Sequence, residues 1–227
     1  MYVLNGTKEL KPGKTWTDDN GVQHPGNWAS VWSDDVKAFY GIKEVTIQAK
    51  PDNKFYWVGQ RSLDGSWTSK ERNLEDVKEV DEDGNAILDK DGNQVITLGL
   101  KSQWIVKTKE TANSLLATTD WQVVAKAERD RAIDSNVATY RAAVITACTA
   151  IRKSITDITD TAIPSGYDAA KAKGEDDRTD DEKKIVSDYE TEVATKFATF
   201  KALFDAPVDS DGKPTDNPPI YDWPDSI

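Results

Sequence analysis

The chain has 227 residues, of which 37% are hydrophobic and 30% charged, and its formal net charge is −11. This length suffices for one large domain or two small ones with a hydrophobic core. The acidic balance argues against a nucleic-acid or anionic-membrane surface, because either would require clustered lysines and arginines. No stretch approaches the ~20 apolar residues of a membrane span.

Short strands and turns are predicted for the beginning of the chain. "YVLNGTKEL" and "TWTDDNGVQHPGNW" each contain an Asn-Gly pair, which is typical of a hairpin turn. "SDDVKAFYG" predicts a short helix that Ser33 caps and Gly41 ends. The alternating "EVTIQA" predicts a strand, and "KFYWVGQRS" is its predicted partner.

Two Asp-Gly-Asn sequences, at residues 83–85 and 91–93, invite comparison with calcium loops. In the register of an EF-hand, position 12 would be Lys90 or Leu98 rather than the required glutamate. Hairpin turns are the simpler interpretation. No metal or cofactor is expected.

Few residues carry recognisable chemistry. The only histidine, His24, precedes a proline in a turn and is expected to make a structural hydrogen bond, and the only cysteine, Cys148, is expected to pack in a helix. A carboxylate pair for glycoside hydrolysis is recognisable only from geometry. Five tryptophans of the N-terminal part allow two interpretations: a small hydrophobic core, which we favour, or a platform on which a sugar stacks. They are Trp16, Trp28, Trp32, Trp57 and Trp67.

The second half of the chain is helical. A helix containing "KTKETANSLLATT" is followed by two long amphipathic helices, which begin at the predicted caps Ser135 and Thr179. The apolar stripe of the first long helix contains Val137, Tyr140, Val144, Cys148, Ile151, Ile155 and Ile158. That of the second contains Val186, Tyr189, Val193, Phe197, Phe200 and Phe204. The two stripes predict an antiparallel helical hairpin or coiled coil that also contacts a partner.

These elements predict an α+β protein with three parts. Residues 1–105 form a Trp-rich β/turn domain, residues 106–206 a helical domain, and residues 207–227 an irregular, proline-rich tail. The tail is not expected to order itself. Its order would therefore indicate that a partner chain holds it.

The joint "LLATTDW" is the most informative motif. Asp120 is expected to end a helix, Trp121 to fold back over that end, and a short extended piece to follow. Tyr140 would then pack on the same side, and Arg141 would pair with nearby acids. If Trp121 is buried in this way, Trp121→Ala should cost about 3–5 kcal/mol.

This order of motifs resembles the tail-assembly-chaperone and tail-fibre-assembly proteins of tailed bacteriophages. Their recurring feature is Leu-Leu-Ala, one or two residues, Asp-Trp, and then a helix that begins with Tyr-Arg. The likeness is good over residues 112–144 and looser in "DDNGVQHPGNWASVWSDDVKAFYGI" and "IYDWPDSI". The matching residues are Leu115, Leu116, Ala117, Asp120, Trp121, Tyr140 and Arg141.

The resemblance implies a non-enzymatic tail component or assembly factor that binds other phage tail proteins or its own copies. The expected contacts are made by Trp121, Tyr140, Arg141 and the second helical stripe. Such a protein would reside in the host cytoplasm during assembly and then in the tail of the virion. The additional helix from Thr179 leaves open whether it is retained there. The alternative is a carbohydrate- or receptor-binding module of the tail that uses the N-terminal aromatics.

Overall fold

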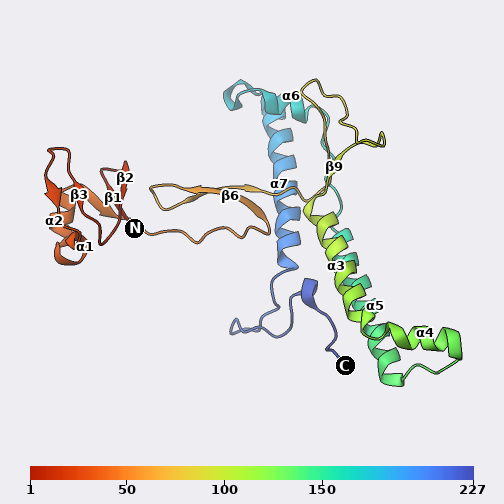
Figure 1. Cartoon of the computed structure of the whole chain (residues 1–227). Helices are drawn as coiled ribbons and strands as arrows, with labels where there is room; N and C mark the ends of the chain where they lie inside the picture. Colours follow the sequence, from red (N-terminus) through yellow and green to blue (C-terminus); the bar gives the residue numbers. More distant parts are fainter. The chain divides into compact units, whose positions relative to one another are not determined.

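The structure, a computed structural model, describes residues 1–227 as two compact units, Met1–Arg72 (unit 1) and Asn73–Ile227 (unit 2) (Figure 1). Both helices and antiparallel sheets are present, which confirms the α+β class. The division between the units differs from the predicted boundary at residue 105. Residue 105 lies inside helix α3 (Leu100–Ala117). The predicted boundary is too late because Trp104 belongs to this helix and not to the tryptophan-rich strands before it.

Unit 1 begins with a three-stranded antiparallel sheet. The strands β1 (Tyr2–Leu4), β2 (Lys8–Leu10) and β5 (Ile42–Glu44) lie in the order β2-β1-β5. Between β1 and β2, Asn5 and Gly6 both have positive φ angles, of 49° and 71°. An Asn-Gly pair accepts this conformation readily, so the predicted first hairpin is confirmed.

The second predicted hairpin and the short helix are also present. Strands β3 (Trp16–Thr17) and β4 (Gln23–His24) pair across the turn that contains Gly21. The single-turn helix α1 (Trp28–Val31) and helix α2 (Asp34–Phe39) follow. The Ser33 hydroxyl accepts a hydrogen bond from the Val36 backbone N–H, which confirms it as the cap of α2.

The strand pairing predicted for residues 44–49 and 54–62 is wrong. Strand β6 (Tyr56–Arg61) pairs with β7 (Trp67–Glu71), and only Glu44 of "EVTIQA" belongs to a strand. A local turn explains the difference. The Asp64 carboxylate accepts hydrogen bonds from the backbone and hydroxyl of Ser66, and the intervening Gly65 has a φ of 84°, so β6 turns directly into β7.

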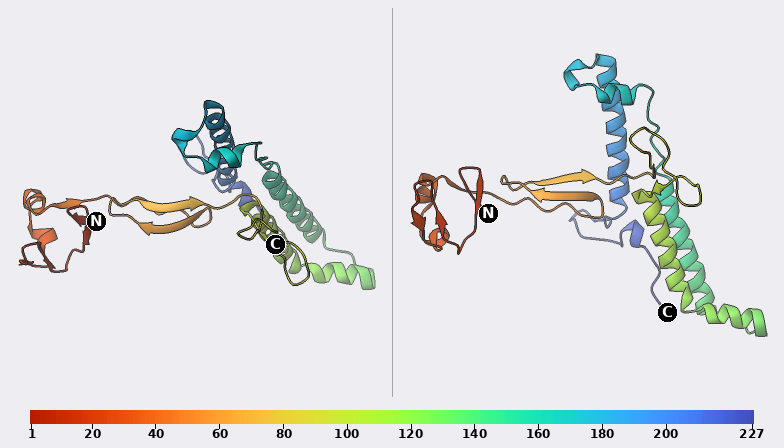
Figure 2. Two further views of the ribbon diagram at one scale, coloured as in Figure 1. Left: turned by 90° about the horizontal axis from the view of Figure 1, so that it is seen from above. Right: turned by 45° about the horizontal axis from the view of Figure 1, so that its top comes forward.

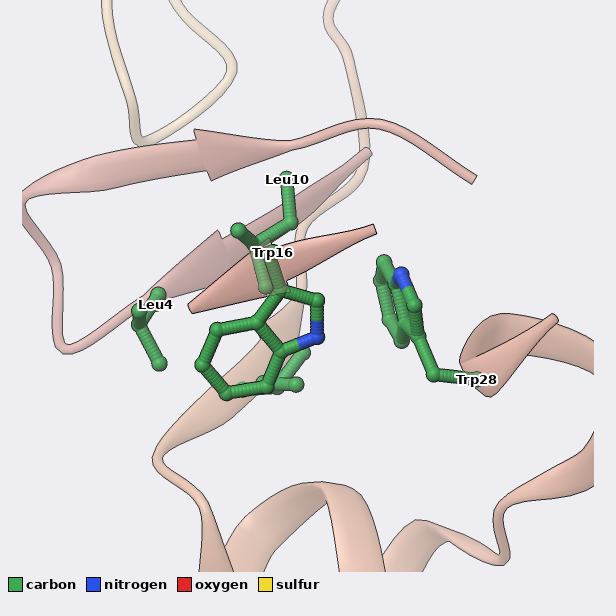
Figure 3. Close-up of a cluster of buried hydrophobic side chains, with 5 residues drawn as sticks. Leu4, Leu10, Trp16 and Trp28 are labelled. Carbon is green, nitrogen blue, oxygen red and sulfur yellow. The ribbon is translucent and has the colours of Figure 1, made fainter. Parts of the chain in front are cut away.

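A compact hydrophobic cluster holds the first part of unit 1 together. Figure 3 shows Leu4 and Trp28 on opposite sides of Trp16, with Leu10 beside it. Trp28 is fully buried, and its indole N–H donates to the Lys14 carbonyl. Two tryptophans therefore supply much of a core in a segment with few aliphatic residues.

Unit 2 opens with strands β8 (Val77–Lys78) and β9 (Ile96–Thr97), which pair with each other. The two Asp-Gly-Asn sequences lie between them as hairpin turns, as predicted. In the first, the Asp81 carboxylate accepts from the backbone N–H groups of Asp83 and Asn85. In the second, Asp89 accepts from Asp91 and Asn93 in the same way.

The helical pair in unit 2 is formed by α3 and α5 (Ser135–Thr156). Helix α4 (Asp120–Arg129) lies between them in sequence. The pair is antiparallel, because Ala112 packs with Tyr140 and Val144, whereas Lys101 near the start of α3 pairs with Asp160 beyond the end of α5. Figures 1 and 2 show the two helices side by side, with α4 at their end.

The predicted pairing of the two long helices is therefore wrong. Helix α7 (Asp180–Ala202) instead contacts α6 (Tyr167–Ala172), which precedes the 3₁₀ turn Glu175–Asp177. Its start is as predicted: Thr179 and Glu182 form a reciprocal capping box. The stripe on α5 is buried as expected, but by the adjacent helix α3, which has its own buried row at Trp104, Thr108 and Ala112.

The proline-rich tail packs on the helices of its own unit. Ile220, in the 3₁₀ turn Pro219–Tyr221, is buried, and its N–H donates to the Leu203 carbonyl. Trp223 packs against the cluster of Ala112, Tyr140 and Val144. The order of the tail therefore does not require a partner chain, contrary to the expectation from its composition. Every helix is too short or too polar to cross a membrane.

Candidate functional site

The joint between α3, α4 and α5 is built around Arg141. Its Nη1 donates to the Leu116 carbonyl at 2.9 Å, to the Thr119 hydroxyl at 2.8 Å and to the Asp120 carboxylate at 2.9 Å. Leu116 lies in the last turn of α3, where carbonyl groups lack partners within the helix and attract a positive charge. Arg141 therefore fixes the end of α3 relative to the start of α4, and the predicted pairing of Arg141 with an acid is present.

A second polar contact holds α4 to the start of α5. The Gln122 amide donates to the Asp134 carboxylate, and the Asp134 backbone N–H donates to the Gln122 side-chain carbonyl, both at 2.8 Å. Gln122 is the only residue of α4 that is buried. Sequence reasoning missed this pair, although the position of Gln122 directly after the Asp-Trp motif was the available signal.

Four apolar side chains lie on the side of α4 opposite Gln122, beside the exposed charges of Asp120 and Glu128. We call this surface the α4 outer face; it consists of Trp121, Val123, Val124 and Ala127, all exposed. Trp121 and Val124 are 53% and 51% exposed. The short helix thus buries a polar side chain and leaves its large apolar side chains exposed, the reverse of an ordinary surface helix.

The predicted burial of Trp121 is wrong. Asp120 does not introduce an extended piece, because it is the first residue of α4, and Trp121 follows in its first turn. The Trp121 side chain is exposed and is covered in part by the Arg131 guanidinium, 5.4 Å from the ring centroid. Thr119, rather than Trp121, is the buried residue that contacts Arg141.

The other predicted partner-binding residues are mostly internal. Tyr140, Val186, Phe197 and Phe200 are buried. Tyr189 is half-buried and lies 4.4 Å from Tyr167 between ring centroids, and Phe204, also half-buried, lies 4.7 Å from Trp104. Val193 is half-buried as well. Trp121 is therefore the only one of the predicted partner-binding residues that the structure leaves exposed.

The aromatic residues of unit 1 surround the single histidine. Ring centroids of Trp16, Tyr40 and Trp32 lie 4.4, 4.7 and 5.3 Å from that of His24. The His24 Nε2 lies 3.1 Å from the Asp18 carboxylate, so the expected structural hydrogen bond is confirmed. The pKa of Asp18 is lowered, chiefly by the hydrogen bond from the Val22 backbone and further by that from His24.

The five N-terminal tryptophans do not share one exposed surface. Trp16 and Trp28 are buried, Trp32 and Trp67 are half-buried, and Trp57 is exposed with the Arg72 guanidinium 4.8 Å from its ring centroid.

Comparisons of the chain with protein-family models, curated proteins and solved structures find no match. No group of three or more histidine, cysteine, aspartate or glutamate side chains is placed to hold a metal ion. In unit 2, the α4 outer face is the place where a tryptophan and two valines are exposed on one short helix.

Proposed function

We propose that the chain is a non-enzymatic bacteriophage tail protein or tail-assembly factor that binds another tail protein through the α4 outer face. The phage assignment rests on the motif resemblance over residues 112–144. The binding surface rests on one observation: α4 exposes Trp121 and Val124 while it buries Gln122. Exposed tryptophan is enriched where proteins meet, because its large ring gains much from desolvation.

The rigidity of the joint supports this role. Arg141 fixes the first residue of α4, and the Gln122–Asp134 pair fixes its inner side. Residues held in place before binding lose less conformational entropy when a partner covers them. A short helix that extends from the end of a helical pair and is held by two polar contacts is well suited to presenting a tryptophan.

A binding assay with surface variants tests the proposal. The full-length chain should retain at least one of the other tail proteins of its phage in a pull-down. The double substitution Trp121→Ala with Val124→Ser should weaken that binding by about thirtyfold or more, the effect of an interface hot spot. The matched control is Val106→Ala on α3, since Val106 is 44% exposed but lies outside the outer face.

Light scattering after size-exclusion chromatography should be run in parallel. If the outer face mediates self-association instead, the oligomer will dissociate in the double variant, and the proposed partner would be wrong. Binding that is equally strong in the double variant would reject the outer face. Mass spectrometry of purified particles would then separate a retained tail component from a transient assembly factor.

A further inference from the structure

Unit 1 contains a pocket that the proposed function does not use. It has a volume of about 380 Å³ and lies between the turn after β3 and the end of α2. We call it the α2 pocket; the residues that matter here are Asn5, Trp16, Asp19, Asn20, Phe39 and Tyr40. This volume falls within the range of about 300–1,000 Å³ that is typical of small-molecule sites.

One side of the α2 pocket is aromatic. Phe39 is 83% exposed, although it is the last residue of α2 and lies next to the buried cluster. Its ring meets Tyr40 edge to face at 5.2 Å, and Tyr40 in turn stacks on Trp32 at 4.9 Å. Tyr40 is therefore held in place, while the flat surface of Phe39 remains available to a ligand. A ligand that covers the exposed Phe39 ring would remove this apolar surface from water, which is favourable.

The other side carries polar groups without partners. The side chains of Asn5, Asp19 and Asn20 make no hydrogen bond within the unit, and neither does the Tyr40 hydroxyl. Asp18, by contrast, is fully engaged: it accepts from the backbone of Asn20 and Val22 and contacts His24. Asp18 thus fixes the turn that carries Asp19 and Asn20, and leaves both of these side chains to bind a ligand.

We infer that the α2 pocket binds a neutral saccharide. A sugar ring has an apolar face of C–H groups, which suits the exposed Phe39 ring, and a rim of hydroxyl groups. The Asp19 carboxylate accepts from hydroxyl groups, and the two amides both donate and accept. No lysine or arginine lines the pocket, and Asp18 and Asp19 give it a negative charge, so acidic sugars are disfavoured.

This inference is independent of the proposed function, because the pocket lies in unit 1 and the α4 outer face in unit 2. The full-length chain should first be applied to an array of neutral and acidic oligosaccharides. Neutral compounds that bind should then be titrated by isothermal calorimetry up to about 20 mM, since small sites of this kind give weak affinities. We expect saturable binding to a neutral oligosaccharide and none to sialylated or phosphorylated ones. Inhibition by the free monosaccharide would distinguish a site for single sugars from one for polymer chains.

Variants locate the site. Phe39→Ala and Asp19→Ala should each weaken binding by about tenfold or more without a change in melting temperature, since Phe39 and Asp19 are exposed. Val31→Ala is the matched control: Val31 is an exposed side chain of unit 1 outside the pocket. Absence of binding to every neutral saccharide would overturn the inference, as would binding that both variants retain. Tighter binding of arginine amide than of any saccharide would show that the pocket selects a cation instead.

Discussion

At the scale of single residues, Arg141 carries the most consequential contact in unit 2. Its side chain is only 17% exposed and serves three acceptors. The contact with Asp120 contributes little to stability, because that carboxylate is largely in water. The contacts with the Leu116 carbonyl and the buried Thr119 hydroxyl contribute more to stability. Without the guanidinium, both of these groups would lose a charged hydrogen-bond donor.

Arg141→Ala should therefore lower the free energy of unfolding by about 2–3 kcal/mol, the cost of removing a charge-assisted contact from groups with little access to water. Urea denaturation followed by circular dichroism measures this change. Arg129→Ala is the control, since Arg129 is exposed at the end of α4 and makes no ion pair. A loss below about 1 kcal/mol would show that water replaces the guanidinium at the joint.

Trp121→Ala should have little effect on stability. The structure leaves Trp121 exposed, so its removal should change the free energy of unfolding by about 0.5 kcal/mol or less. This value replaces the larger one expected from a buried corner. The same denaturation experiment decides between them: a loss of several kcal/mol would mean that Trp121 is covered.

At the scale of elements, local signals predicted structure well and long-range partners poorly. The cap at Thr179, the turn at Asn5-Gly6 and the cap at Ser33 each depend on a few neighbouring residues, and all are present. The predicted cap at Ser135 is wrong, because Ser135 is the first residue of α5 and Asp134 precedes it. An apolar stripe, by contrast, shows which face of a helix is buried and not what buries it. The α5 stripe therefore does not identify α3 as its partner, although α3 is nearer in sequence than α7.

The candidate site shows the same limit. The order of Asp120, Trp121 and Arg141 indicated a joint, and Arg141 lies there. The exposure of Trp121 was not predictable, because it depends on α4 continuing from Asp120 as a helix rather than as an extended piece. The proline-rich tail differs from its prediction because composition excludes a helix but does not exclude docking by isolated apolar residues such as Ile220.

Docking of the tail predicts a stability effect at Trp223. This half-buried ring packs against the cluster of Ala112, Tyr140 and Val144, so Trp223→Ala should lower the stability of unit 2 by about 2 kcal/mol. Thermal and urea denaturation measure the loss. Ile227→Ala, at an exposed position in the same tail, should change almost nothing. Equal behaviour of the two variants would mean that the tail is not held by its tryptophan.

At the scale of the whole molecule, one hairpin-turn design recurs in both units. An aspartate begins the turn and its carboxylate accepts two backbone N–H groups, while a glycine with positive φ follows three residues later. The design begins at Asp18, Asp81, Asp89 and Asp209. The acidic composition is thus partly structural, because several carboxylates stabilise turns.

These turns predict a characteristic response to acid. The pKa values of Asp81 and Asp89 lie below the usual 3.8, chiefly because of hydrogen bonds from the Asn85 and Asn93 backbones, respectively. A carboxyl whose pKa is lower in the folded state stabilises the fold above its unfolded pKa, and this contribution is lost as the pH falls through the folded value. The double variant Asp81→Asn with Asp89→Asn cannot titrate at these positions. At pH 7 it should melt at a lower temperature than the parent chain.

The difference between the two melting temperatures should then shrink as the pH is lowered below 3.8, because the protonated aspartates of the parent come to resemble asparagines. Comparison with the variant is necessary, since acid also changes the net charge from −11 through zero at about pH 4.7 to positive values, and this change affects both proteins almost equally. Thermal melts followed by circular dichroism between pH 2.5 and 7 measure the difference. A gap that stays constant over this range, or widens in acid, would show that the two carboxylates do not stabilise their turns.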